Sequence, residues 1–515
     1  MEQKKIGKVY LVGAGPGDPG LITVKGRALL ERAEVVVYDY LANKRFLSHV
    51  PADAELIYVG KKGGGIHAQT QDEINRILVD KALAGRMVVR LKGGDPFIFG
   101  RGGEEIEEIA KFGIPFEIVP GVTAASAAAT YAGIPITHRQ YTATVAFVTG
   151  HEDPTKQDST IAWDKLATGV GTLVFYMGIK NLPNITERLI RYGRSPETPV
   201  AVIRWASTPA HQTVTGTLAT IVEVVQTAAI KPPAVIVVGE VVTLRPTINW
   251  FEKKPLLGKR IMVTRTREQA SDLVMRLEEL GADCVEFATI ALEPPDTWEA
   301  LDQAVDDRGR FDWLLFTSIN AIQFFFRRLF ERQLDARALA GMKIAVVGNA
   351  TAAELQKYGL KADLLPAKEF TGEGLAATLI EQGAGAARFL LPRALKANEA
   401  LPEILQQAGA KVTIVPVYQN VRPKGREEAL RQEFIDRIDM VTFTSSSTFT
   451  NFIYMLNPKD ETELRQLLDG IKIASIGPVT GKAIHQKGLT VDVQPKESYS
   501  IATMVQAITD FYGER

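Results

Sequence analysis

The amino-terminal half of the chain is best understood from residues 88–105, which run VVRLKGGDPFIFGRGGEE. The first four residues, Val88–Leu91, predict a short buried strand, and a loop with five glycines leads to a helix expected to open at Glu104. In an open α/β sheet, ligands bind outside the carboxyl ends of the strands, where glycines let backbone approach a ligand closely. Asp95 can accept hydrogen bonds there, and Arg101 can hold an anion. The alternative is a glycine-rich turn in which Asp95 only caps a helix.

Length and composition describe a large protein with several domains. The chain has 515 residues, 46% of them hydrophobic, which is enough for more than one core. Its 60 basic and 60 acidic residues cancel, so no basic excess predicts binding to nucleic acid. No apolar run approaches the roughly 18 residues of a membrane span, and the start does not resemble a signal peptide. We therefore expect a cytoplasmic protein that does not bind a membrane.

Cysteine and histidine usage argues against disulfides and metal. The single cysteine, Cys284, excludes an internal disulfide and lies in a strand-like segment, 281–287, which predicts a buried and inert thiol. The six histidines are scattered, and none has the spacing of a metal-binding pair. We therefore expect no protein-bound metal.

Short β-branched runs alternate with amphipathic stretches along the whole chain, which is the pattern of parallel sheets covered by helices. The strands predicted in the first half are Val9–Val12, Val35–Tyr38, Leu56–Val59, Val88–Leu91, Phe116–Val119, Val145–Thr149, Leu173–Tyr176, Val200–Ile203 and Val235–Val238. The pattern lapses between Leu244 and Gly258, where prolines and a charged cluster predict a boundary, and a new strand begins within 259–265. The fold class is therefore α/β, in domains of residues 1–250 and 258–515.

The second half contains an internal repeat with a period near 128 residues. Lys343–Thr351 (KIAVVGNAT) returns as Lys472–Thr480 (KIASIGPVT), and Phe316–Ser318 returns as Phe443–Ser445. Matches in the same order at nearly one spacing predict two similar α/β lobes, with a cleft between them as the natural ligand site. The alternative is that α/β proteins reuse the same glycine–turn–helix chemistry generally.

The glycine loop Gly13–Asp18 (GAGPGD) is similar to a dinucleotide-binding loop but departs from it. The third glycine of that motif falls at Asp18, whose carboxylate would oppose a pyrophosphate, and Pro16 removes a backbone donor. Asp39 ends the next strand at about the distance of a ribose-binding acid. Despite these glycines, we expect no NAD site.

The same loop opens a series of motifs that resembles the tetrapyrrole methyltransferases, and among them the uroporphyrinogen-III C-methyltransferases. The motifs extend in register from about Gly7 to Phe251 and comprise residues 13–18, 36–39 (VVYD), 59–61 (VGK), 90–105, 120–126 (PGVTAAS), 133–139 (GIPITHR) and 176–178 (YMG). The resemblance implies two α/β subdomains that bind S-adenosylmethionine between them. It also implies double methylation of uroporphyrinogen III to precorrin-2, and a homodimer through this half.

The resemblance further implies which residues touch the cofactor. They are Pro16, Gly93, Gly94, Asp95, Ile98, Thr123, Ala124, Met177 and Ala206. Small residues such as Thr123 and Ala124 permit hydrogen bonding through the backbone, and Met177 offers a soft apolar wall. Relatives often carry glycine where Ala206 stands, which should narrow the pocket slightly.

The substrate of this family carries many carboxylates, which require arginine or lysine donors. Arg101 and Arg139, with Glu104 beside them, are the implied tetrapyrrole contacts, and Arg101 is implied in catalysis as well. Because a pyrrole carbon attacks the methyl group, a proton must be removed, and the implied acid–base pair is Asp39 and Lys61. The alternatives are that Asp39 caps a turn and that Lys61 is only solvated.

The second half resembles uroporphyrinogen-III synthase from about Gly258 to Phe511. The matching motifs are 316–321 (FTSINA), 347–351 (VGNAT), 416–418 (PVY), 443–446 (FTSS) and 476–480 (IGPVT). The resemblance implies two α/β lobes and a cofactor-free reaction in which hydroxymethylbilane loses water and closes with its last pyrrole inverted. It implies substrate contacts at Thr317, Ser318, Thr351, Ser445, Ser446 and Thr480. Tyr418 is implied to assist departure of the hydroxyl, while the alternative for about half of the Ser and Thr residues is helix capping.

The two halves together predict a bifunctional enzyme, a cyclising hydro-lyase joined to a methyltransferase, that makes uroporphyrinogen III and methylates it for sirohaem or cobalamin synthesis. Two alternatives stay open: a methyltransferase that acts on a later corrin intermediate, and a non-catalytic tetrapyrrole-binding sensor. The presence of Asp39, Lys61, Arg101 and Tyr418 disfavours the sensor.

Overall fold

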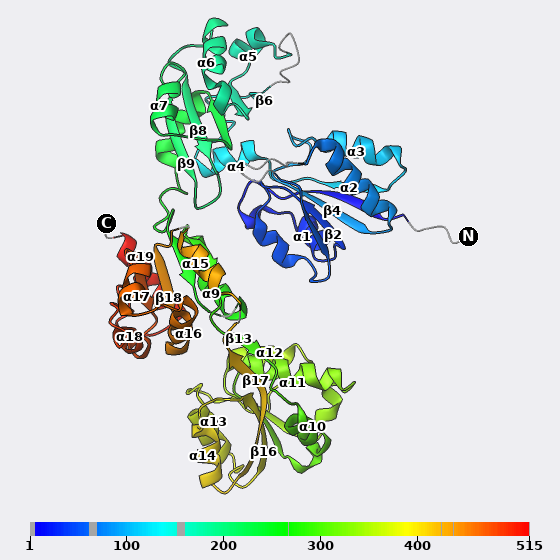
Figure 1. The fold of residues 1–515 in the computed structure, drawn as a ribbon, viewed down its shortest axis with the longest axis vertical. Coiled ribbons are helices and arrows are strands. Elements are labelled where there is room, and N and C mark those ends of the chain that lie inside the picture. The colour runs from blue at the N-terminus through cyan, green and yellow to red at the C-terminus, as the bar shows by residue number, and fades with distance from the viewer. Residues whose placement is uncertain are drawn as a thin grey trace, which may run out of the picture. The chain divides into compact units, whose positions relative to one another are not determined.

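The computed structural model describes residues 6–60, 69–151, 160–265, 267–423, 425–435 and 437–513. The chain divides into two compact units. The first unit comprises Met1–Lys259, Leu277–Asp283 and Tyr512–Arg515, and the second comprises Arg260–Arg276 and Cys284–Phe511. Both units are built from β-sheets flanked by helices (Figure 1). The predicted domains, residues 1–250 and 258–515, stay predictions.

The first sheet of the first unit is parallel, with the strand order β3-β2-β4-β1-β5. Its strands are β1 (Lys8–Gly13), β2 (Val35–Tyr38), β3 (Glu55–Tyr58), β4 (Met87–Lys92) and β5 (Phe116–Val119), each within one residue of its predicted range. One face of the sheet packs on α2 (Gln71–Leu83) and α3 (Gly102–Lys111), and the other packs on α1 (Val24–Leu30) (Figure 1). Burial of both faces explains the nearly continuous apolar runs of these strands.

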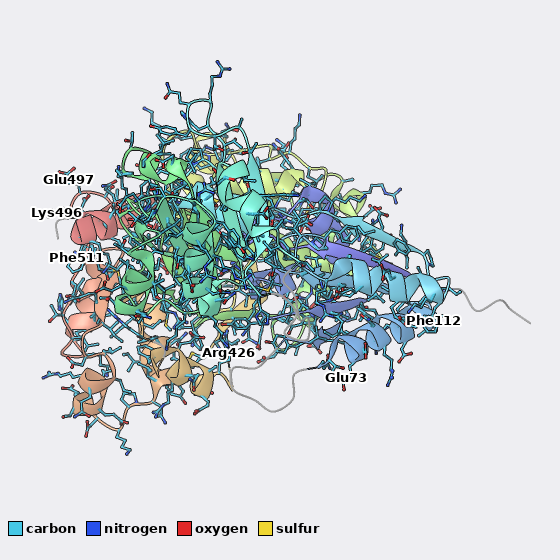
Figure 2. All side chains as sticks on the ribbon, turned by 90° about the horizontal axis from the view of Figure 1, so that it is seen from above. Glu73, Phe112, Arg426, Lys496, Glu497 and Phe511 are labelled. Atoms are coloured by element: carbon cyan, nitrogen blue, oxygen red, sulfur yellow. The ribbon has the colours of Figure 1, made fainter. Side chains whose placement is uncertain are left out.

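The ends of α2 and α3 follow from local signals. Thr70 and Glu73 form a capping box at the start of α2, in which the Glu73 carboxylate accepts from the Thr70 backbone N–H at 2.6 Å. Helix α3 begins at Gly102 rather than at Glu104 as predicted, because Arg101 adopts a left-handed conformation with φ 58° and turns the chain just before it. The C-cap of α3, Phe112, lies exposed at the surface (Figure 2).

The second sheet of the first unit is mixed, with the order β6-β7-β10-β8-β9. Its strands are β6 (Val145–Thr149), β7 (Thr172–Tyr176), β8 (Pro199–Arg204), β9 (Gln212–Thr217) and β10 (Ala234–Val238). Strand β9 was not predicted, because this antiparallel edge strand buries little of its polar sequence. One face packs on α5 (Trp163–Gly169), α6 (Leu182–Arg191) and α7 (Ile221–Thr227), and the other on α4 (Ala124–Tyr131).

The second unit also contains two sheets, ordered β12-β11-β18-β19 and β13-β17-β16-β14-β15. The strands are β11 (Arg260–Val263), β12 (Asp283–Glu286), β13 (Ala291–Glu293), β14 (Trp313–Phe316), β15 (Lys343–Val346), β16 (Arg388–Ala394), β17 (Lys411–Val421), β18 (Met440–Phe443) and β19 (Lys472–Ser475). The chain leaves the first of these sheets after β12 and returns to it at β18. Cys284 lies in β12 and is buried, as predicted.

The remaining α-helices complete the two units. They are α8 (Arg245–Ile248), α9 (Arg267–Glu279), α10 (Glu299–Asp306), α11 (Ile319–Glu331), α12 (Asn349–Gln356), α13 (Gly372–Glu381), α14 (Ala400–Gln407), α15 (Glu427–Ile435), α16 (Ser446–Leu456), α17 (Glu461–Leu467), α18 (Pro478–His485) and α19 (Ile501–Gly513). None of the helices in the described ranges combines the length and the apolarity that a membrane span requires.

The internal repeat is confirmed by equivalent hydrogen bonds in the two sheets of the second unit. In β15 the backbone N–H of Ile344 donates to Asp363 Oδ2 at 2.7 Å. At the matching position of β19 the N–H of Ile473 donates to Asp492 Oδ2 at 2.9 Å. The sequence repeat therefore corresponds to a repeated piece of structure rather than to shared turn chemistry alone.

Candidate functional site

Three glycine-containing loops meet at the carboxyl ends of β1, β4 and β5. The backbones of Gly15 and Gly94 are hydrogen-bonded in both directions, with N···O distances of 2.7 and 3.2 Å. A Cβ on Gly121 would lie 2.3 Å from the Gly94 carbonyl oxygen and 2.8 Å from Gly13 Cα. No side chain fits such distances, so glycine at position 121 is what allows the three loops to approach. We call this contact of Gly13, Gly15, Gly94 and Gly121 the glycine junction.

Asp95 stabilises the glycine junction through two hydrogen bonds to backbone N–H groups. Its Oδ1 accepts a hydrogen bond from the Phe97 N–H at 2.8 Å, and its Oδ2 accepts from the Gly121 N–H at 3.0 Å. Neither donor belongs to a helix, so the alternative in which Asp95 caps a helix is wrong. The carboxylate instead bridges the loop after β4 to the loop after β5. Its predicted contact with the cofactor stays a prediction.

The first turn of α4 lies beside the glycine junction. Thr123 is the N-cap, but its hydroxyl is hydrogen-bonded to the phenol of Tyr176 and not to a helix N–H. The Tyr176 oxygen also accepts from the Ala125 N–H at 2.9 Å, and burial raises the pKa of this phenol. Gly94 has φ +70°, and a Cβ there would face the Ala124 backbone nitrogen at 3.7 Å. Three predicted cofactor residues are thus neighbours, and Tyr176 joins them as a residue to which the sequence assigned no role.

The loop that carries Pro16 contacts the loop after β8, which comes from the other sheet. The backbone N–H of Asp18 donates to Ser207 Oγ at 3.1 Å. A Cβ on Gly17 would lie 3.3 Å from the carbonyl oxygen of Ala206. The predicted cofactor residues Pro16 and Ala206 therefore belong to loops of the two sheets that touch each other.

Backbone strain gathers in the same loops. Nine non-glycine residues in the described part of the chain have positive φ, and five of them are Phe99 (52°), Arg101 (58°), Met177 (55°), Trp205 (46°) and Ser207 (62°). Such conformations cost about 1 kcal/mol or more each and persist only where the surroundings impose them, which is typical of functional sites. Met177 is 53% exposed, and Ile98 and Gly93 in another of these loops are half-buried.

The residues predicted to bind tetrapyrrole carboxylates lie on the surface. Arg101 Nε is 2.5 Å from Glu104 Oε2, and both side chains are more than half exposed. Arg139 is exposed in the segment that joins α4 to β6. The structure therefore pairs Arg101 with Glu104 and leaves Arg139 accessible, and the contact of these three residues with the tetrapyrrole stays a prediction.

Asp39 follows β2 and has two kinds of partner. Its Oδ1 accepts from the Leu41 N–H at 3.1 Å, which is the turn-capping contact foreseen as the alternative. Its Oδ2 lies 3.3 Å from Nη2 of Arg90, a residue that the sequence did not single out. The other member of the implied acid–base pair, Lys61, lies outside the described residues.

Arg90 belongs to a buried charged cluster that sequence reasoning missed. Lys92 Nζ is 2.6 Å from Glu105 Oε1, and Arg90 Nε is 3.5 Å from the same oxygen. Gln71 Nε2 donates to this oxygen as well, at 3.2 Å. The available signal was the spacing, because Arg90 and Lys92 alternate with apolar residues in a buried strand and so share one face.

In the second unit, two of the predicted substrate residues are helix caps, as the alternative foresaw. Ser318 Oγ accepts from the Ala321 N–H at 3.1 Å at the start of α11. Ser445 Oγ accepts from the Thr448 N–H at 3.2 Å at the start of α16. Both occupy equivalent places in the repeat, at the ends of β14 and β18.

Tyr418 is brought next to one of these caps. It lies on β17, is 8% exposed, and its ring stacks on Phe324 with centroids 5.6 Å apart. The phenol oxygen is 3.4 Å from Ser318 Oγ. Two residues predicted for the same reaction, far apart in the sequence, are therefore in contact.

The other predicted hydroxyls differ in exposure. Thr317 is half-buried directly after β14, and Ser446 Oγ donates to the Val479 carbonyl at 3.2 Å. Thr351 and Thr480 are both buried, in the first turns of the equivalent helices α12 and α18. Their contact with a substrate stays a prediction.

Comparison with known proteins defines the class. Residues 8–222 match the family model of tetrapyrrole (corrin/porphyrin) methylases, and residues 271–506 match that of uroporphyrinogen-III synthase HemD. The chain is thus a fusion of a tetrapyrrole methylase with a uroporphyrinogen-III synthase, and both resemblances drawn from the motifs are confirmed. It belongs to the family of the porphyrin biosynthesis protein HemD of Ruminiclostridium josui, to which it is 38% identical over 98% of both chains.

Two further relatives match the first half. The S-adenosyl-L-methionine-dependent uroporphyrinogen III methyltransferase of Methanosarcina barkeri is 53% identical over 47% of this chain and 95% of its own. A crystal structure of uroporphyrin-III C-methyl transferase from Thermus thermophilus, complexed with S-adenyl homocysteine, is 42% identical, covers 46% of this chain and 100% of its own, and gives a TM-score of 0.40.

Proposed function

We propose that the second unit converts hydroxymethylbilane to uroporphyrinogen III and that the first unit methylates this product twice, giving precorrin-2 for sirohaem or cobalamin synthesis. The support is a match along nearly the whole length of a porphyrin biosynthesis protein, with both functional halves in one chain. We further infer that the chain acts in the cytoplasm as a homodimer through the first unit.

S-adenosylmethionine is the methyl donor in this proposal, and the described residues suit it. Gly94 has a left-handed backbone and leaves its Cβ position open toward the Ala124 amide. The side chain of Thr123 is held by Tyr176 and does not cap the first helical turn, although the Tyr176 oxygen accepts from the Ala125 N–H of that turn. Pro16, Gly93, Ile98, Met177 and Ala206 would complete the contacts. When bound, the cofactor supplies an electrophilic methyl group.

The polar residues of the first unit bind the substrate and transfer the proton during methylation. Arg101 and Arg139 bind carboxylates of the tetrapyrrole, since exposed guanidinium groups form forked hydrogen bonds with such anions. Asp39 takes up the proton that the pyrrole carbon loses after the new carbon–carbon bond forms. Lys61 is the proposed partner of Asp39 in this proton transfer.

The second unit needs an acid and hydroxyl groups. The phenol of Tyr418, next to Ser318, donates a proton to the departing hydroxyl so that water leaves and the ring closes. The other hydroxyl groups lie at the ends of strands or in the helices that follow them, and we propose that the substrate lies there. They belong to Thr317, Thr351, Ser445, Ser446 and Thr480.

The test supplies the purified full-length chain with hydroxymethylbilane and methyl-labelled S-adenosylmethionine. We expect uroporphyrinogen III without the cofactor, and a doubly labelled product with it. Label that enters only a later corrin, supplied separately, would favour the later-acting methyltransferase. Binding of tetrapyrrole without any turnover would favour the sensor. The isomer must be identified, because hydroxymethylbilane also closes spontaneously, to the other isomer.

A further inference from the structure

A connected row of charged groups leads from the interior of the first unit to Asp39. Arg90 and Lys92 come from β4, on the face covered by α3, and Glu105 comes from α3. Glu105 Oε1 is 2.6 Å from Lys92 Nζ and 3.5 Å from Arg90 Nε. Arg90 Nη2 is in turn 3.3 Å from Asp39 Oδ2. The order of the row is therefore Lys92, Glu105, Arg90, Asp39.

This arrangement is costly to bury. The side chains of Lys92, Arg90 and Glu105 are 6%, 3% and 0% exposed, against 25% for Asp39. Burial lowers the pKa of Lys92, and the positive charge of Arg90 lowers it further, while Glu105 acts in the opposite direction. Apolar residues of similar volume are often as stable as buried ion pairs or more so. Stability alone therefore does not account for the row.

The guanidinium of Arg90 has hydrogen-bond partners at Nη1 and Nη2, whereas its buried Nε has an ion-pair contact but no hydrogen bond. Its Nη1 donates to the carbonyl of Leu91 at 3.1 Å and to that of Val37 at 3.4 Å, so both β4 and β2 hold it. Its Nε faces Glu105. The remaining nitrogen, Nη2, is the one directed at Asp39.

We propose that Arg90 is a positioning residue for methyl transfer: the Lys92–Glu105 pair and two strand carbonyls fix its guanidinium, which holds the Asp39 carboxylate in place at the end of β2. The inference rests on the proposed function, in which Asp39 takes up a proton. Arg90 touches neither substrate nor cofactor in this role, since it is buried, and it acts through Asp39.

The test is a double-mutant cycle in the full-length chain with Arg90→Lys, Asp39→Asn and the two combined. Arg90→Lys keeps the positive charge but loses the planar fork. We expect it to lower kcat for methylation about 10- to 100-fold, the effect of losing a charged hydrogen bond. The KM for uroporphyrinogen III and the Kd for S-adenosylmethionine should stay within about twofold, because Arg90 contacts neither ligand. In the Asp39→Asn background, Arg90→Lys should change kcat by less than about twofold.

Thermal unfolding and the stoichiometry of S-adenosylmethionine binding report how much of the first unit is folded in each variant, and synthase turnover of the same samples reports the second unit. Should Arg90→Lys fail to fold, Glu105→Gln provides the same test, since it leaves Arg90 in place and weakens what fixes it. An equal loss from Arg90→Lys in both backgrounds would overturn the inference and leave the role of Asp39 standing. Wild-type turnover of Asp39→Asn alone would overturn that role, and with it the inference.

Discussion

Gly121→Ala tests whether the glycine junction shapes the cofactor site. The new Cβ would lie 2.3 Å from the Gly94 carbonyl oxygen and 2.8 Å from Gly13 Cα. The distance to the Gly94 oxygen is about 1 Å shorter than ordinary van der Waals contact. Both neighbouring atoms belong to the backbone, so they cannot move away by a side-chain rotation. Gly94 is hydrogen-bonded to Gly15, and the Gly121 N–H is held by Asp95, so both loops resist the shift.

The cost can be estimated from similar overpacking. Forcing extra atoms into a close-packed region costs about 1–3 kcal/mol. If the loops shift to relieve the contact, the binding free energy of the cofactor becomes less favourable by that amount. This corresponds to a fall in affinity of about 5- to 150-fold. If they do not shift, the same cost appears as lower stability of the first unit. In both cases the synthase half should keep its activity, since Gly121 lies in the other unit.

The assay is calorimetric titration of the full-length chain with S-adenosylmethionine, together with thermal unfolding and synthase turnover. Gly103→Ala is the matched control. A Cβ there has nothing within 4 Å, and the residue lies in the first turn of α3, where alanine is favoured over glycine by about 1 kcal/mol. Gly103→Ala should bind the cofactor like the wild type. Wild-type affinity and stability of Gly121→Ala would refute the assignment of the glycine junction to the cofactor site.

Three more substitutions test other parts of the proposal. Asp95→Ala should abolish cofactor binding but leave synthase activity intact, because it releases both the Phe97 and the Gly121 N–H; unchanged affinity by calorimetry would contradict this. Arg101→Ala should lower methylation about 10- to 150-fold while sparing cofactor binding, since the lost contact is a charged hydrogen bond to substrate; wild-type kcat and KM would make Arg101 only a loop residue. Tyr418→Phe should slow ring closure about 100-fold or more if the phenol is the acid, whereas wild-type turnover would leave it a packing residue beside Phe324.

The strands of the first unit could be predicted closely because their burial dictates their sequence. β2 is the apolar run VVVY, buried on both faces, and its predicted and observed bounds agree. β9 is the opposite case, since QTVTGT at an exposed antiparallel edge carries little apolar signal. The same reasoning explains why the repeat of the second unit was visible: its strands and the glycines that follow them must satisfy the same packing twice.

The candidate site was predicted less completely, because sequence motifs name residues but not their contacts. Asp95 was identified, yet its partner Gly121 lies on another loop, and the helix-capping alternative stayed open until the structure showed this contact. Arg90 and Glu105 stood inside a motif already quoted and received no role, since charged residues are expected to be exposed. Only the folded strand order, which places β2 beside β4, shows that Arg90 reaches Asp39.

Residues 88–105 form one segment whose own ion pair, Lys92–Glu105, stabilises it, and this segment contains both Asp95 and Arg101. Side chains of β4 alternate, so Val89 and Leu91 fill the core beneath α1 while Arg90 and Lys92 face α3. The loop after β4 then contributes Gly94 to the glycine junction, and Glu105 at its far end lies 2.6 Å from Lys92, so an ion pair joins the two ends of the loop. Arg101, the proposed substrate ligand, and Asp95, in the loop proposed to bind the cofactor, both lie between Lys92 and Glu105, so the same ion pair supports both of them.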